Sequence, residues 1–185
     1  MNGKQSGALI ALFFSLALPL HANAQAKSKS QPDSGFNKAM LAYQGQNYTG
    51  AYKLLLPLAK KGYAPAMAQL AYMYEYGIGV RKDAGEAGKL YKKLLSHYMA
   101  EAQQGDAEAQ YQVGQLHYGG KGVPENIPEA MRWYAKAGEN GHLESQYKLA
   151  LLFDSGEKAP RDPQASVLWY TKAAEQGHAK SQMFL

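Results

Sequence analysis

The sequence predicts an all-α fold, an α-solenoid or superhelix of about four stacked antiparallel helix pairs. Two observations predict it. A pattern of small, bulky and turn residues recurs along the chain at intervals of 36 or 43 residues. Each half of the recurring unit also places apolar or small residues at the i, i+3, i+4, i+7 spacing of an amphipathic helix. Because a single helix pair cannot bury both of its faces, such pairs stack on one another.

The second helix of each unit is delimited at both ends. An acid or amide precedes it and defines units beginning near 47, 83, 126 and 162, with the residues Asn47, Asp83, Asn126 and Asp162. A glycine follows it, at Gly62, Gly105, Gly141 and Gly177. Between these limits lies a bulky pair, at Leu54-Leu55, Leu90-Tyr91, Trp133-Tyr134 and Trp169-Tyr170.

The helix limits carry capping chemistry. Asp83 and Asn126 are followed three residues later by Glu86 and Glu129. This spacing predicts capping boxes, which satisfy the unpaired N–H groups at a helix start. Each closing glycine is predicted to adopt the left-handed conformation that ends a helix.

Small residues recur at two positions of the first helix. One set should allow helix backbones to approach closely, so that a larger side chain would overpack the contact, at Ala71, Gly114 and Ala150. The other set should be buried between helices, at Ala66, Ala109, Ser145 and Ser181. In the turns between paired helices, Gly79 and Gly122 are permissive residues, whereas the third copy has Lys158 at this place. We therefore expect the third turn to be built differently.

The third unit carries these features together in "AEAQYQVGQLHYGGKGVPENIPEAMRWYAKAGENGH". With its A-x-A-Q opening, G-x-G-V turn, W-Y-x-K-A segment and closing Gly-His, this segment resembles the Sel-1-like repeat, a branch of the tetratricopeptide-like α-solenoids. The resemblance covers residues 36–185, and it implies an interaction scaffold with no shared reaction. Departures are the 43-residue unit, Lys158 and a short last copy.

The 43-residue unit holds seven extra residues, placed after Tyr91 by the match of Asp83–Tyr91 to Asn126–Tyr134. Seven residues are almost two helical turns, so one continuous helix from about Ala84 to Gln104 keeps its apolar stripe. We expect two turns to project past the neighbouring helices, carrying Leu95, Tyr98 and Met99. The favoured interpretation is that these side chains pack under a locally longer repeat, and the alternative is that they form an apolar patch for a partner or a second copy.

The N-terminal residues have the layout of a secretory signal peptide. Lys4 precedes an apolar run from Ala8 to Leu20, and Ala22-Asn23-Ala24 forms an A-x-A cleavage signal. The run is too short to span a bilayer. We therefore predict a signal peptide at 1–24, a disordered linker at 25–35 and a repeat domain at 36–185, in a protein that is periplasmic or secreted. The chain has no cysteine, so packing alone must hold it together.

The sequence indicates no catalytic, cofactor or metal site. The histidines show no i, i+4 pair, and His142 and His178 recur at a structural position after the closing glycine. Ser145 and Lys148 match the S-x-x-K pattern of serine β-lactamases, but no S-D-N or K-T-G motif accompanies them. The basic doublets are too sparse for a nucleic-acid surface. We therefore predict no enzymatic activity, with β-lactam hydrolysis as the third and weakest alternative.

Binding is then the expected function. The first helices of such a solenoid line its groove, where side chains that the repeat pattern does not use decide the ligand. By register these are Tyr72, Gln115 and Leu151 at one position, and Glu75, Tyr118 and Asp154 at another. Tyrosine suits a binding surface because it offers area and a hydrogen bond at low entropy cost. Tyr111 and Tyr147 are expected to pack between repeats.

We predict an exported adaptor that binds a protein or peptide partner in the bacterial cell envelope. The alternative is a self-associating structural component of an envelope complex, which uses the projecting helix or the C-terminal edge. At that edge, residues 179–185 begin another first helix, since Ala179, Ser181, Gln182 and Leu185 match Ala107, Ala109, Gln110 and Val113. We interpret this segment as a short capping helix over the Trp169-Tyr170 side of the last pair.

Export with cleavage after Ala24 predicts a mature protein that begins at Gln25. Replacing both Ala22 and Ala24 with Lys removes the small residues that the cleavage signal requires, so we expect the leader to stay attached. Intact-mass spectrometry of the expressed protein checks both results. A wild-type chain that is recovered only with its leader would contradict the prediction.

Overall fold

The computed structural model describes residues 34–184, and this part of the chain contains nine helices and no strand. The helices are α1 Ser34–Gln44, α2 Tyr48–Lys60, α3 Ala64–Tyr76, α4 Ala84–Gln103, α5 Ala107–Tyr118, α6 Ile127–Glu139, α7 Leu143–Ser155, α8 Pro163–Glu175 and α9 Ala179–Gln182. The predicted all-α solenoid is confirmed. The predicted signal peptide and most of the predicted linker lie outside the described residues.

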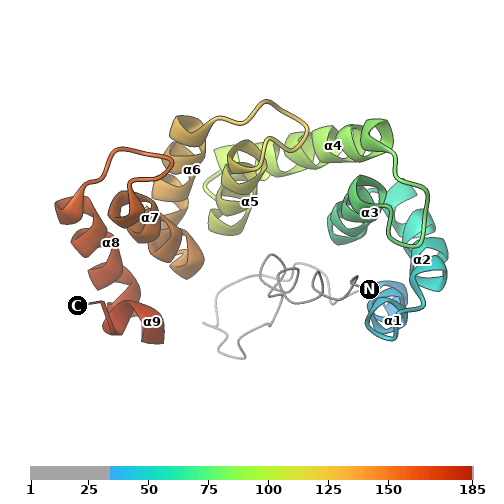
Figure 1. Ribbon diagram of the computed structural model, residues 1–185, viewed down its shortest axis with the longest axis horizontal. Coiled ribbons are helices and arrows are strands. Elements are labelled where there is room, and N and C mark those ends of the chain that lie inside the picture. The colour runs from blue at the N-terminus through green and yellow to red at the C-terminus, as the bar shows by residue number, and fades with distance from the viewer. Residues whose placement is uncertain (1–33, 185) are drawn as a thin grey trace, which may run out of the picture. The chain divides into compact units, whose positions relative to one another are not determined.

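Consecutive helices pack against each other along the whole of this part of the chain. The first helices α3, α5 and α7 lie on the inner side of the helical stack, and the second helices α4, α6 and α8 lie on its outer side (Figure 1). The inner helices therefore present one continuous set of side chains from successive repeats.

The second helices begin where the sequence predicts, but only half of each capping box forms. The Asp83 and Asn126 side chains accept from the backbone N–H groups of Glu86 and Glu129, both at 3.0 Å. The two glutamates do not reach back: Glu86 pairs with Lys89, and Glu129 pairs with Arg132.

The backbone N–H of each capping residue finds its acceptor elsewhere. Asp83 donates to the carbonyl of Tyr74, and Asn126 donates to that of His117. Asp162 makes the same bond to Phe153 at the next pair. Each second helix is thus tied at its start to the end of its own first helix, which makes the reciprocal glutamate bond unnecessary.

The closing glycines adopt the predicted left-handed conformation, with φ of +84°, +91°, +84° and +85° at Gly62, Gly105, Gly141 and Gly177. A Cβ atom at any of them would meet no atom within 4 Å. The glycine is therefore needed for its backbone angle and not for space.

The core lies between first and second helices, and the small positions are buried as predicted. Ala71 and Ala150 are fully buried, and so are Ser145 and Ser181. At Gly114 a Cβ atom would lie 2.7 Å from the ring of Tyr134 and 3.2 Å from the carbonyl oxygen of Ala130. Here the α5 and α6 helices meet with no room for a methyl group.

The extra residues extend α4 as one uninterrupted helix, as predicted, but they do not project freely. Leu95 and Tyr98 pack against a cluster that includes Met67 and Leu116. Together with Met99 they also pack against the cluster of Ala102, Ala109, Val113 and Trp133. The expected projection is therefore wrong, and of the two interpretations packing under a locally longer repeat describes these side chains, whereas the apolar patch does not.

The turn glycines show how the longer helix is accommodated. A Cβ atom on Gly79 would lie 2.5 Å from the backbone of Tyr48, the first residue of α2. A Cβ atom on Gly122 would lie 2.6 Å from Lys92 and 2.7 Å from Tyr91, seven residues beyond the first residue of α4. The α5–α6 turn has therefore moved along α4 by the length of the insertion, almost two whole turns, and it meets the same face of the helix.

The C-terminal helix is shorter than predicted, because α9 ends at Gln182. Beyond it, the Phe184 ring stacks on that of Tyr170, with centroids 4.8 Å apart and planes inclined by 15°. The segment thus covers the end of the molecule with one helical turn, in which Ser181 is buried, and its Phe184 ring covers the Tyr170 side of α8.

The close contact at Gly114 generates a stability prediction. In Gly114→Ala the new methyl group collides with a fully buried ring, so we expect a loss of about 1–3 kcal/mol in the free energy of unfolding. Gly88 on α4 is the matched control, because a Cβ atom there meets nothing within 4 Å. Gly88→Ala should add about 0.5–1 kcal/mol through helix propensity. Urea unfolding of both variants measures the difference, and equal effects would contradict the close contact.

Candidate protein-binding face

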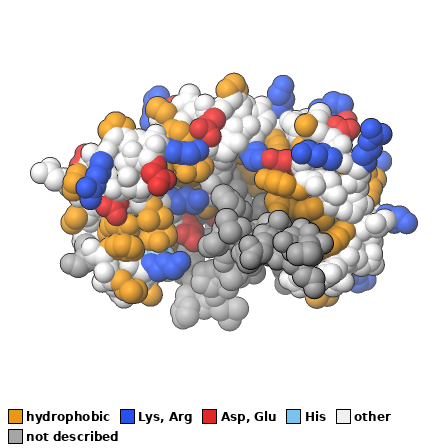
Figure 2. Space-filling model, in the orientation of Figure 1, with side chains coloured by type: hydrophobic (Ala, Val, Ile, Leu, Met, Phe, Trp, Pro, Cys, Tyr) orange, Lys and Arg blue, Asp and Glu red, His pale blue; other side chains and the backbone are white. Residues whose placement is uncertain are grey.

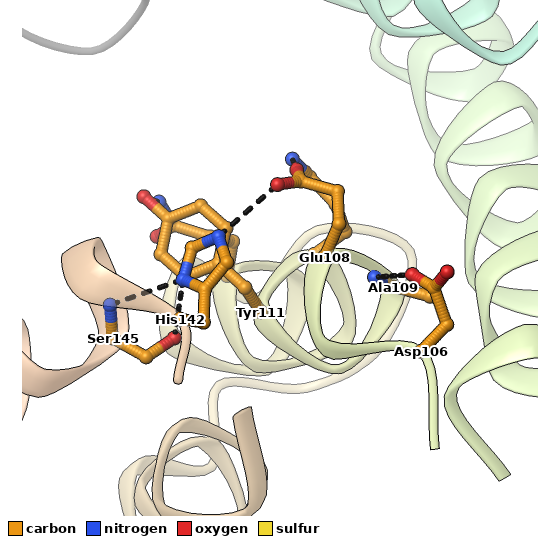
Figure 3. Close-up of polar contacts among 8 residues, drawn as sticks. Asp106, Glu108, Ala109, Tyr111, His142 and Ser145 are labelled. Atoms are coloured by element: carbon orange, nitrogen blue, oxygen red, sulfur yellow. Dashed lines mark hydrogen bonds and ion pairs between the residues drawn. The ribbon is translucent and has the colours of Figure 1, made fainter. Parts of the chain in front are cut away.

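In the last two repeats a histidine caps the next first helix and joins it to the first helix before it. His142 precedes α7, and its Nδ1 atom accepts from the backbone N–H of Ser145 at 3.2 Å. The neutral ring then carries its proton on Nε2, which lies 3.0 Å from Glu108 Oε2 on α5. The ring also stacks on Tyr111, with centroids 4.5 Å apart (Figure 3).

The same arrangement recurs one repeat later. His178 caps α9 by accepting from Ser181 N–H at 3.2 Å, and its ring lies 4.4 Å from that of Tyr147. The prediction that these histidines are structural and that Tyr111 and Tyr147 pack between repeats is therefore confirmed. The hydrogen bond from His142 lowers the pKa of Glu108.

On the inner face, Glu75 is held by two partners from other elements. The Tyr91 hydroxyl of α4 donates to its Oε2 atom at 2.8 Å, and Lys121 of the α5–α6 turn forms an ion pair with its Oε1 atom. The Lys121 ammonium also lies 5.5 Å from the centroid of the Tyr91 ring. Burial, followed by the hydrogen bond to Glu75, raises the pKa of Tyr91, so this hydroxyl stays protonated and donates at neutral pH.

Gln115 holds a second hydrogen-bonded group. Its side-chain amide donates to the Tyr111 hydroxyl at 2.6 Å, and its oxygen accepts from the Tyr134 hydroxyl at 2.9 Å. Because Tyr134 is fully buried in the core, its hydroxyl holds the Gln115 side chain of the inner face in a fixed position relative to the core.

Tyr118 lies between two lysines of the following repeat. The Lys158 ammonium is 4.6 Å from the centroid of its ring, and the Lys148 ammonium is 5.9 Å from it. Both distances are within the range of a cation–π attraction. Lys158 is also paired with Glu125 at 3.1 Å.

Tyr72 and Leu151 complete the predicted set. The Tyr72 ring lies 4.6 Å from that of Tyr76. Leu151 occupies the position of Gln115 in the next repeat, and 37% of it is exposed. Because leucine stands here in place of glutamine, a hydrogen bond is lost. The buried hydroxyl of Tyr170, the counterpart of Tyr134, has no hydrogen-bond partner among the described residues.

The structure thus brings Glu75, Gln115, Tyr118 and their neighbours onto one face, whereas Leu95, Tyr98 and Met99 pack into the contact between α4 and α5. The sequence reasoning missed the roles of Lys121 and Lys148. Only one copy of the repeat has a lysine at this position, because Ile78 and Glu157 stand at the equivalent place in the other two copies. No repeat pattern therefore marks Lys121. Lys148 was visible only as part of the S-x-x-K match.

That match does not form a catalytic pair. Ser145 is fully buried, with its hydroxyl 3.0 Å from His142 Nδ1. Lys148 instead points its ammonium toward Gln115 Oε1, at 3.4 Å. Within residues 34–184, no group of three His, Cys, Asp or Glu side chains could hold a metal ion.

A cavity of about 680 Å³ lies outside the inner face, at the third turn. It is lined by Ile127, Pro128 and Met131 of α6 together with Lys158 and Pro160 of the turn. Ile127 is the counterpart of Tyr48, which Gly79 covers in the first copy. Since Lys158 replaces the glycine, the turn cannot lie on the helix in the same way, and the prediction of a differently built turn is confirmed.

The surface carries both signs of charge. On the face that Figure 2 shows, basic and acidic side chains are interspersed among apolar and uncharged ones. Among the described residues, no helix is both long enough and apolar enough to cross a membrane.

A stack of helix pairs with aromatic and charged side chains along its first helices defines the class of α-solenoid repeat proteins. Comparison with known protein families shows which kind of α-solenoid repeat the chain contains. The Sel1 repeat matches residues 64–96, 107–142 and 143–178, which is more than half of the chain. The chain belongs to the Sel1 repeat family.

Two curated proteins are similar to parts of the chain. One is the ERAD-associated E3 ubiquitin-protein ligase component HRD3 of Candida glabrata, 42% identical over 55 residues, which are 30% of this chain and 7% of that protein. The other is an exopolysaccharide production negative regulator of Rhizobium meliloti, 30% identical over 108 residues, with 51% of this chain and 38% of that protein covered. The chain spans well under half the length of either relative.

Two solved structures share the fold. The Sel1 repeat protein from Oxalobacter formigenes aligns over 81% of this chain and 57% of its own, with 27% identity and a TM-score of 0.53. A protective antigen of uropathogenic Escherichia coli with an SLR fold aligns over 80% of this chain and 31% of its own, with 29% identity and a TM-score of 0.55.

The His142–Glu108 contact predicts a pH-dependent contribution to stability. Because the folded state lowers the pKa of Glu108 below its ordinary value of 4.5, the contribution is present above pH 4.5 and is lost as the pH falls through the folded pKa. Glu108→Gln should therefore be less stable than the wild type by about 0.2–1 kcal/mol at pH 7, and the gap should close as the pH falls through the folded pKa, which lies below 4.5.

Urea unfolding across this pH range measures the gap. Glu139→Gln, which changes an exposed carboxylate at the end of α6, is the control for the loss of one negative charge. A gap for Glu108→Gln that stays constant from pH 7 to pH 3 would contradict the assignment.

Proposed function

We propose that this chain is an interaction scaffold that binds an extended segment of a protein partner along the inner face of α3, α5 and α7. The binding residues would be Tyr72, Glu75, Gln115, Tyr118 and Leu151. One observation carries the proposal: the inner face holds aromatic and polar groups that are fixed by bonds within and between repeats, and next to them an apolar side chain is left exposed.

Fixed side chains favour binding because their rotamers are already ordered. The Tyr91, Tyr111 and Tyr134 hydroxyls hold Glu75 and Gln115 in place, so little conformational entropy remains to be lost when a ligand docks. The polar groups would orient the backbone of an extended segment, and Leu151 would contact an apolar side chain of it. Sel1 repeats serve as protein-interaction scaffolds, and the similar Candida protein is a component of a ubiquitin ligase, which supports this use of the fold.

We further propose that the scaffold acts after export, in the bacterial cell envelope. The support is the basic, apolar and A-x-A layout of residues 1–24.

The inner face is favoured over α4 as the binding surface, because Leu95, Tyr98 and Met99 are largely used in packing between repeats.

Self-association is the second candidate, and the C-terminal edge favours it. Val167 and Leu168 on α8 and Met183 and Phe184 after α9 are exposed apolar side chains. A second copy could cover them, and the protein would then act as a structural component of an envelope complex. Light scattering of the mature chain over a range of concentrations separates this candidate from a monomeric scaffold.

Site-specific photocrosslinking tests the inner face. Benzoylphenylalanine in place of Leu151 should crosslink a partner in cells of the native host, because this side chain is exposed beside the proposed ligand path. Leu54 on α2 is the matched control, since it is exposed to almost the same extent, 39% against 37%. The same probe at Leu54 should capture little.

A partner is identified as a crosslinked band on a gel that is present with the probe at Leu151 and absent or weak with the probe at Leu54. Equal capture from the two positions, or capture from Leu54 alone, would exclude the inner face. A crosslinked dimer of the chain itself would favour self-association.

A further inference from the structure

Three lysines lie along the inner face, and their partners differ. Lys121 forms an ion pair with Glu75, and Lys158 forms one with Glu125. Lys148, on α7 between them, has no carboxylate within ion-pair distance among the described residues. The other two positive charges are therefore neutralised, and one unit of charge is left at Lys148.

The surroundings of Lys148 resemble an incomplete binding site. Its ammonium lies 5.9 Å from the centroids of both the Tyr111 and Tyr118 rings. Its contact to Gln115 Oε1 is long, at 3.4 Å, and that oxygen already accepts from Tyr134 at 2.9 Å. An ammonium has three donors, so at least two of them remain for another acceptor.

The position is costly for the folded chain, which argues against a purely structural role. Lys148 is half-buried, and this burial lowers its pKa because the charged form is disfavoured away from water. The nearby Glu144 opposes this effect, but burial is the larger cause. A partner group that supplies a negative charge would remove the cost.

On the basis of the function proposed above, we propose that Lys148 binds a carboxylate of the partner segment, with Tyr111 and Tyr118 on its two sides. One unpaired ammonium matches one monovalent carboxylate, either an Asp or Glu side chain or a C-terminal carboxylate. Leu151 lies one helical turn further along α7, so an apolar residue of the segment would follow the carboxylate.

Fluorescence anisotropy with peptide pools tests the site in the mature chain. The pools are N-terminally labelled, C-terminally amidated hexapeptides in which one position at a time is fixed as Asp, Asn, Glu or Gln. The wild type should bind the acidic pools about tenfold more tightly than the amide pools at one position, as expected for hydrogen bonds to a charged group. Repeating the measurement with free C-termini shows whether a terminal carboxylate is preferred to a side chain.

Two variants with the same change of charge identify the lysine. Lys148→Gln should bind the acidic and amide pools equally. Lys136→Gln, which removes an exposed lysine of α6 that lies over the Trp133 ring, should keep the wild-type preference. If Lys148→Gln keeps the wild-type preference for carboxylates, or if the wild type prefers neither acidic side chains nor free C-termini, the carboxylate site is wrong.

The pools also separate this inference from the function on which it rests. Binding to the wild type without any preference for acidic side chains or for free C-termini would contradict the carboxylate site and leave the peptide-binding face standing. Failure of every pool to bind would count against both.

Thermal unfolding gives an independent readout. Lys148→Met removes a desolvated charge and keeps the aliphatic stem, so its Tm should equal or exceed that of the wild type. A fall in Tm together with an unchanged acidic preference in Lys148→Gln would assign the lysine to the fold alone.

Discussion

The contact between Gly114 and the ring of Tyr134 is the constraint on which the centre of the molecule depends. Because Gly114 has no side chain, the Tyr134 ring of α6 lies directly on the backbone of α5 and is fully buried. Its hydroxyl then reaches Gln115 on the inner face, which in turn donates to Tyr111. Tyr111 stacks on His142, the cap of the next first helix. A single close approach in the core thus positions both the inner face and the following repeat, because each step is a short contact between ordered side chains.

The seven extra residues of α4 show how a solenoid absorbs an insertion. Seven residues rotate an α-helix by almost two whole turns, so the next turn meets the same face of α4 further along. The glycine of that turn now rests on Tyr91 and Lys92. Tyr91 also donates to Glu75 of its own repeat and lies beside Lys121 of the following one. The insertion therefore changes which residues meet across the inner face, although every helix keeps its place in the order.

Much of the fold was predictable from local patterns, and the candidate site much less so. The caps at Asp83 and Asn126, the left-handed glycines and the buried serines follow from rules that act over a few residues. The register also placed Glu75, Gln115 and Tyr118 on the inner helices. Their partners could not be predicted, because Lys121 and Lys148 reach them from other repeats. The expected projection of Leu95, Tyr98 and Met99 was wrong for the same reason: the position of α5 along α4 is a tertiary property.

The sequence by itself determined the all-α class, the period of the helix pairs, their limits and the small residues at their contacts. These features depend on the spacing of side chains along one chain and on backbone preferences of single residues. Only the tertiary structure decided how far each repeat sits along its neighbour, and therefore which charges are paired. It paired Lys121 with Glu75 and Lys158 with Glu125 and left Lys148 between two tyrosine rings. Such pairing depends on distances between helices far apart in sequence, and no local pattern encodes those distances.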